Sequence, residues 1–97
     1  MPRKKNQSQI CIVTVTGKDR VGIIARLATV MARANINIVD VNQKIMENFF
    51  VMTMACDIAK ANISIPTIHK RLEKIANEMK LNITFQDETI FKMMHRI

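Results

Sequence analysis

The chain of 97 residues is long enough for one hydrophobic core and too short for two. Hydrophobic residues make up 48% and charged residues 24%, as in soluble globular proteins, and the apolar runs are too short to span a membrane. The formal charge of +7 raises nucleic acid as a partner, but the cations are spread along the chain. Because no apolar signal segment follows the basic N-terminus, we expect a cytoplasmic protein without membrane contact.

Residues 1–8 carry no apolar pattern and are predicted to form a flexible basic arm, followed by a single domain over residues 9–97. The domain opens with a β-branched strand beginning at Ile10. Every second residue of this strand is apolar, and these residues form its apolar face: Cys11, Val13 and Val15.

After Gly17 the apolar period becomes helical and continues to Asn35, which we expect to end the helix in a left-handed conformation. The predicted apolar stripe contains Ile24, Leu27, Ala28, Met31 and Ala34. Asp19 precedes the helix and is its predicted N-cap, since a carboxylate suits the positive end of the helix dipole.

Residues 36–45 and 49–57 are predicted to form an antiparallel hairpin, with Asn48 accepting a positive φ in the turn. The core face of the second of these strands is expected to carry Phe50, Met52, Met54 and Cys56. Ser64 is expected to cap the next helix, with Pro66 in its first turn. The apolar stripe of that helix consists of Ile68, Leu72, Ile75 and Met79.

A short strand over residues 81–85 and a terminal amphipathic helix complete the chain. The predicted apolar side of this last helix contains Ile90, Phe91, Met94 and Ile97. The order β-α-β-β-α-β predicts an α+β, ferredoxin-like sandwich, in which an antiparallel four-stranded sheet carries both longer helices on one face.

The sequence offers little for catalysis or metal binding. The two histidines, His69 and His95, have no partner at a triad or metal-ligand spacing, and no two carboxylates are spaced for acid–base chemistry. Cys11 and Cys56 are far apart and are expected to be small buried hydrophobes rather than ligands. We therefore predict no catalytic residue, no metal and no cofactor.

Nucleic-acid binding is the main alternative, because RNA-recognition modules share this order of elements. Those modules stack bases on aromatic residues of the two central strands. The first strand here has none, and Phe49 and Phe50 are adjacent and point to opposite faces. These observations argue against nucleic acid. A structural interaction domain without a ligand is a further alternative.

The turn between the first strand and the first helix is the one stretch that suggests a site. Gly17 permits a sharp exit from the strand, and Gly22 lets a ligand or a neighbouring backbone approach the first helical turn. Free N–H groups at a helix start bind carboxylates. From the residues alone, both glycines also fit a role as ordinary turn residues.

The segment GKDRVGII at residues 17–24, with NINI at residues 35–38, resembles ACT domains. Their first loop usually contains Asp-Arg-Pro-Gly-Leu-Leu, and an Asn-Ile turn ends their first helix. The ending IFxxMHRI at residues 90–97 is similar to a family of small stand-alone ACT-domain proteins of unassigned function, akin to the regulatory domains of glycine-cleavage-system repressors. The resemblance covers about residues 9–97.

This resemblance implies a non-catalytic regulatory domain that pairs side by side into a homodimer. ACT domains commonly bind an amino acid at the subunit interface, so a role in regulating amino-acid metabolism follows, and a regulated protein partner is left open. The implied ligand-binding positions are Gly17, Asp19, Arg20, Val21, Gly22, Ile23, Ile24, Asn37 and Asp40.

Within this set the resemblance implies distinct roles. The loop backbone from Asp19 to Ile24 would receive the carboxylate of the ligand, and the Asp19 side chain would take a polar or ammonium group. Asn37 from the second strand of the partner would complete the pocket, with Asp40 nearby. Val21 replaces the usual proline and so restores a backbone N–H. In serine-binding relatives an amide side chain occupies the position of Asp19, and a polar side chain occupies the position of Gly17.

Overall fold

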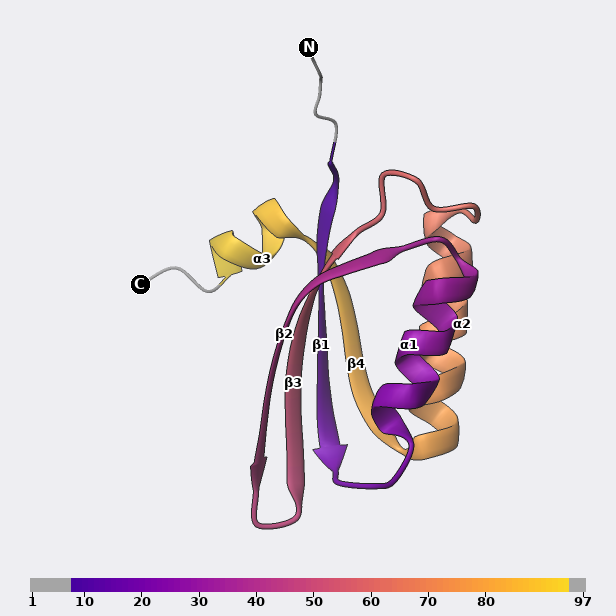
Figure 1. The fold of residues 1–97 in the computed structure, drawn as a ribbon. Coiled ribbons are helices and arrows are strands. Elements are labelled where there is room, and N and C mark those ends of the chain that lie inside the picture. Colours follow the sequence, from indigo (N-terminus) through magenta and orange to yellow (C-terminus); the bar gives the residue numbers. More distant parts are fainter. Residues whose placement is uncertain (1–7, 95–97) are drawn as a thin grey trace.

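The computed structural model describes residues 8–94 and contains four strands and three helices. In chain order the elements are β1 (Ile10–Lys18), α1 (Ile23–Arg33), β2 (Asn37–Met46), β3 (Phe49–Asp57), α2 (Ile65–Met79), β4 (Leu81–Asp87) and α3 (Glu88–Met94). The strands form one sheet of order β2-β3-β1-β4 in which all neighbours are antiparallel. Helices α1 and α2 lie side by side on one face, and α3 lies on the other side (Figure 1). The predicted ferredoxin-like fold is confirmed.

The core lies between the sheet and the two longer helices. Every residue predicted for the apolar faces of the first and third strands is buried, and so is the predicted stripe of α2. None of the helices within residues 8–94 is long and apolar enough to cross a membrane. Residues 1–7 of the predicted arm lie outside the described residues, and so does Ile97 of the predicted terminal stripe.

The predicted stripe of α1 is wrong at its first position. Ile23 is 2% exposed and faces the sheet, whereas Ile24 is 46% exposed. Leu27 and Met31 follow Ile23 at four-residue steps and are fully buried, as predicted. Consecutive helical residues differ by about 100° in direction, so a stripe through Ile23 turns Ile24 away from the core.

The predicted N-cap Asp19 is also wrong, because α1 begins later than the charge pattern indicated. The N-cap is Gly22, with φ of 95° and no side-chain hydrogen bond to the helix. β1 continues to Lys18, and residues 19–22 are needed to turn the chain toward the helix. The Asp19 N–H donates instead to the Asn48 carbonyl at 2.7 Å.

Two further turn predictions have different outcomes. Asn35 has φ of 58° and follows the C-cap of α1, which confirms its left-handed conformation. In the β2–β3 turn the positive φ falls on Glu47, not on Asn48 as predicted. Met46 pairs with Phe49, so the turn has only two residues and its first position takes the unusual conformation.

The α2 cap and the terminal helix complete the fold. The Ser64 hydroxyl accepts a hydrogen bond from the Thr67 N–H at 3.3 Å, which confirms the predicted cap. Helix α3 contacts β1 and β4. Ile12, which alternates with the core residues of β1, is only 8% exposed. The predicted terminal helix is present, and Ile90 on it is 53% exposed.

Cys11 and Cys56 are cross-strand neighbours on the core face, and both are free thiols. They are 4% and 0% exposed, which confirms their prediction as small buried hydrophobes. Burial, with the neighbouring Cys11 thiol, raises the pKa of Cys56 to about 11. Burial and the nearby Asp87 carboxylate also raise the pKa of Cys11.

The raised pKa of Cys56 predicts a loss of stability at alkaline pH. An unfolded thiol ionises near its ordinary pKa of 9.0, whereas the folded one stays neutral to about pH 11. Since the unfolded state gives up this proton first, the free energy of unfolding should fall by about 2 kcal/mol between these pH values. Urea unfolding across this range would measure the fall. An unchanged pH dependence in Cys56→Ala would contradict the assignment.

Candidate functional site

The loop between β1 and α1 is anchored at both of its sides. The Asp19 N–H of this loop donates a hydrogen bond to the Asn48 carbonyl in the β2–β3 turn, so the loop and the turn lie at the same end of the sheet (Figure 1). On the other side, the Arg20 guanidinium donates to the Met79 carbonyl at 3.1 Å. A cation at a helix C-terminus is favourable, so Arg20 fastens the loop to the last turn of α2.

Between these anchors the start of α1 is open to solvent. The first N–H groups of an α-helix have no carbonyl partner within the helix, and no side chain of the described residues 8–94 caps those of α1. Val21 is 101% exposed, and a Cβ at Gly22 would meet no atom within 4 Å. The loop therefore presents unobstructed N–H donors at the positive end of the α1 dipole.

Positions 17 and 22 require glycine for different structural reasons. Gly22 has φ of 95°, a conformation that side chains rarely adopt. Gly17 lies inside β1 and pairs with Phe50 and Leu81, so the predicted sharp exit from the strand at Gly17 is wrong. A Cβ there would lie 2.7 Å from Leu81 Cδ2. Close packing against β4 thus accounts for Gly17.

The structure separates Asn37 and Asp40 from the loop within one chain. Asn37 pairs with Asp57 at one end of β2, and Met46 pairs with Phe49 at the end beside the loop. β2 has ten residues and so spans roughly 30 Å. One molecule therefore cannot bring Asn37 and its own β1–α1 loop to the same ligand.

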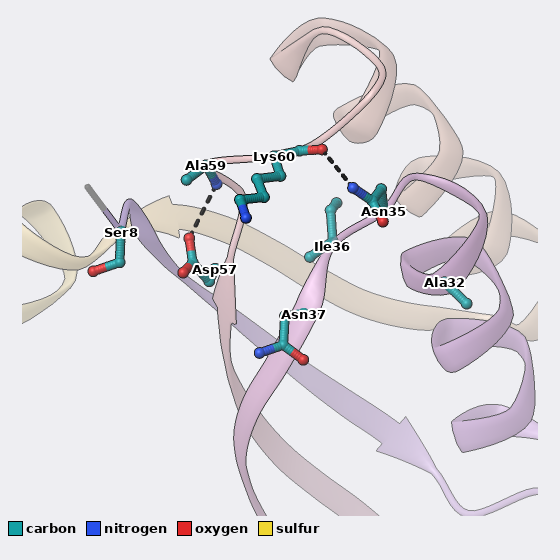
Figure 2. A pocket seen from close by; sticks show the side chains of 8 residues that line it. All are labelled: Ser8, Ala32, Asn35, Ile36, Asn37, Asp57, Ala59 and Lys60. Atoms are coloured by element: carbon teal, nitrogen blue, oxygen red, sulfur yellow. Dashed lines mark hydrogen bonds between the residues drawn. The ribbon is translucent and has the colours of Figure 1, made fainter. Parts of the chain in front are cut away.

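A cavity of about 490 Å³ lies at the Asn37 end of the sheet, where α1 ends and β3 leads into the next loop (Figure 2). It is lined by Ser8, Ala32, Asn35, Ile36, Asn37, Asp57, Ala59 and Lys60. This volume suits a small metabolite. Of the predicted site residues, only Asn37 belongs to it.

The cavity holds one charge of each sign. The Asp57 carboxylate accepts hydrogen bonds from the N–H groups of Ala59 at 3.0 Å and Gln9 at 3.1 Å. The Lys60 side chain extends back toward Asp57, as Figure 2 shows, and its ammonium has no partner among residues 8–94. Asn35 donates its amide to the Lys60 carbonyl at 2.9 Å and so fixes the wall. The cavity thus offers a cation and an anion for a zwitterion.

Sequence reasoning missed Asp57 and Lys60. They lie at the end of β3 and in the loop after it, and their signal was an acid and a base three residues apart at a strand end. Nothing in that spacing indicates that the end of α1 lies beside them. Within the described range 8–94, no group of three His, Cys, Asp or Glu is placed to hold a metal ion.

β2 forms an exposed edge of the sheet. Four of its apolar side chains are about half exposed, namely Val39, Val41, Ile45 and Met46. The strand follows β3 at the outside of the order β2-β3-β1-β4, so one row of its backbone groups has no strand partner among residues 8–94. A long apolar edge of this kind is a template for pairing with another strand.

The sheet does not present the aromatic platform of an RNA-recognition module. Phe50 is 2% exposed and faces the core, so it is not available for stacking. Phe49 is 47% exposed but lies at the very end of β3. The centre of the open face carries the paired threonines Thr14, Thr53 and Thr84 instead.

Comparisons with known proteins agree on the family. Residues 9–86 match the family model described as ACT domain. A UPF0237 protein of Methanocaldococcus jannaschii is 45% identical over 86 residues, which cover 89% of this chain and 96% of that protein. A UPF0237 protein of Listeria innocua is 41% identical over 86 residues, covering 89% and 97%.

Solved structures show the same fold. An ACT domain protein from Streptococcus pneumoniae has a TM-score of 0.73 and 25% identity, covering 88% of this chain and 96% of that one. A putative glycine cleavage system transcriptional repressor has a TM-score of 0.65 and 20% identity, covering 84% of this chain and 46% of the other.

Proposed function

This chain belongs to the ACT domain family, and on that premise we propose that it is a non-catalytic cytoplasmic sensor that binds a free amino acid as a homodimer. One observation carries the proposal. The open β1–α1 loop and the charged cavity at Asn37 lie at opposite ends of one exposed edge strand. An antiparallel pairing of two such edges brings each loop beside the cavity of the partner.

The geometry of β2 supports this pairing. Antiparallel strands place the start of one beside the end of the other, so a two-fold axis near the middle of β2 creates two equivalent sites. Each site then combines the loop of one protomer with Asn37, Asp57 and Lys60 of the other. The paired edges would also cover the half-exposed apolar side chains of β2.

The charges of the site suit an amino acid. The N–H groups of residues 22–24 and the Lys60 ammonium attract the carboxylate of the ligand. The Asp19 and Asp57 carboxylates attract its ammonium group. Arg20 holds the loop in place through Met79. Asp40 lies three residues after Asn37 on β2 and does not line the cavity; in the proposed dimer it borders the shared site.

A thermal-melt screen of the full chain against the common amino acids, with glycine included, tests this proposal. A ligand that binds only the folded state adds about 2.7 kcal/mol at one hundred times its dissociation constant. For a domain of this size the melting temperature should rise by about 10 °C or more. If no amino acid raised the melting temperature, the proposal would be overturned.

A matched pair of variants locates the site. Asn37→Ala should greatly reduce the rise in melting temperature, because Asn37 lines the cavity. Asn82→Ala should leave the rise intact, because Asn82 is exposed on β4, at the edge of the sheet opposite β2. Equal losses in the two variants would contradict the assignment of Asn37.

The proposed regulatory role requires a protein that responds to the ligand. Ligand binding would order the loop and the partner cavity together, and a regulated protein would recognise that state. Amino-acid metabolism is the proposed setting, since the glycine cleavage system repressor has the same fold.

A further inference from the structure

A groove between α1 and α2 gathers cations on the surface that faces away from the sheet. Its volume is about 530 Å³. It is lined by Ala25, Arg26, Thr29, Val30, Arg33, Arg71, Lys74 and Ile75. The groove shares no residue with the β1–α1 loop or with the cavity at Asn37.

One ion pair sets the register of the two helices. α1 and α2 lie side by side and run in opposite directions (Figure 1). The Arg26 guanidinium on α1 donates to the Glu78 carboxylate on α2. This hydrogen bond lowers the pKa of Glu78, so the pair remains charged at neutral pH.

Two turns along the groove the same register brings two like charges together. Arg33 follows Arg26 by seven residues on α1, and Arg71 precedes Glu78 by seven residues on α2. Seven residues correspond to about 10.5 Å along either helix, so Arg33 lies opposite Arg71. Both line the groove, and Lys74 lies one turn from Arg71 on the same wall. The position that holds a carboxylate beside Arg26 holds an arginine here.

None of these three cations has a carboxylate partner in the described part of the chain, where the ion pairs are Arg26–Glu78 and Lys92–Glu88. Facing cations repel each other unless an anion lies between them. Guanidinium groups bind phosphate through two parallel hydrogen bonds. Beneath them, Val30 and Ile75 give the groove an apolar floor.

We propose that this groove is a second binding site, for a phosphorylated small molecule whose phosphate bridges Arg33 and Arg71. Lys74 adds a third positive charge for a second phosphate. The apolar floor accommodates the organic part of the molecule. The site lies on the outer face of the helices, so it remains accessible when two β2 edges pair.

Isothermal titration of the full chain with pyrophosphate and with ATP, at constant ionic strength, tests the proposal. Both should bind the unmodified protein, and tighter binding of ATP would assign the apolar floor to its nucleoside. The double variant Arg33→Gln/Arg71→Gln should weaken pyrophosphate at least about tenfold, because it removes two charge-assisted contacts. The control Lys18→Gln/Lys92→Gln changes the net charge equally and should retain the affinity.

A further variant distinguishes a loss of phosphate binding from a loss of folding. Arg71→Glu places a carboxylate opposite Arg33, as Glu78 lies opposite Arg26, so it should fold and melt no lower than the unmodified protein. It should nevertheless lose pyrophosphate binding. The proposal is overturned if neither phosphate compound binds, or if both double variants lose equal affinity.

Discussion

Replacing Ile23 with alanine is expected to lower the free energy of unfolding by about 2–5 kcal/mol, whereas Ile24→Ala should cost less than about 1 kcal/mol. The two residues are adjacent and identical, but Ile23 is 2% exposed and Ile24 is 46% exposed. Removing Ile23 leaves a cavity above the sheet beside Leu27, whereas removing Ile24 mainly uncovers solvent-facing surface. Urea unfolding of the two variants would measure the difference.

The comparison between the two variants is its own control, because both make the same chemical change in the first turn of α1. Any effect of alanine on helix propensity is common to them. Equal losses of stability would mean that the first turn of α1 does not pack as described. A larger loss at Ile24 would restore the apolar stripe predicted from the sequence.

Replacing Val41 with lysine is expected to convert the proposed dimer into a monomer and to abolish the response to amino acids. Val41 lies near the middle of β2 and is 47% exposed. In the proposed two-fold pairing the introduced lysines of both protomers come close together, and charges on an edge strand oppose pairing. Sedimentation velocity would report the change in mass, and the thermal-melt screen would report the loss of ligand binding.

Ile90→Lys on α3 is the matched control for this experiment. Ile90 is 53% exposed and lies on α3, which contacts β1 and β4 and not β2. This variant should remain a dimer with an unchanged ligand response. A monomeric unmodified protein at all concentrations would contradict the pairing. A monomeric Val41→Lys that still bound the amino acid would contradict a site shared between two protomers.

The faces of the strands and of α2 could be predicted because a local period determines them. Alternating residues of β1 and β3 point to opposite sides, so the burial of Val13 or Met54 follows from its place in the alternation. A cap depends on one residue and its neighbours, which is why Ser64 was found. Family-level motifs also lie within single short segments of the chain.

Predictions failed where the position of a boundary mattered. The apolar period of α1 is compatible with Ile23 or Ile24 as its first buried residue, and only packing on the sheet decides between them. Asp19 satisfies the composition of an N-cap, but its N–H is held by Asn48 on the hairpin. Likewise the two-residue hairpin turn placed the positive φ on Glu47.

By itself, therefore, the sequence determined the order of elements, the buried faces of β1, β3 and α2, and the family, since these depend on residues close together in the chain. The tertiary structure alone decided which distant residues meet. It placed Lys60 and Asp57 beside Asn37 in one cavity, and it aligned Arg33 with Arg71 across two antiparallel helices. The physical reason is that contacts between elements depend on their packing register, which no local period encodes.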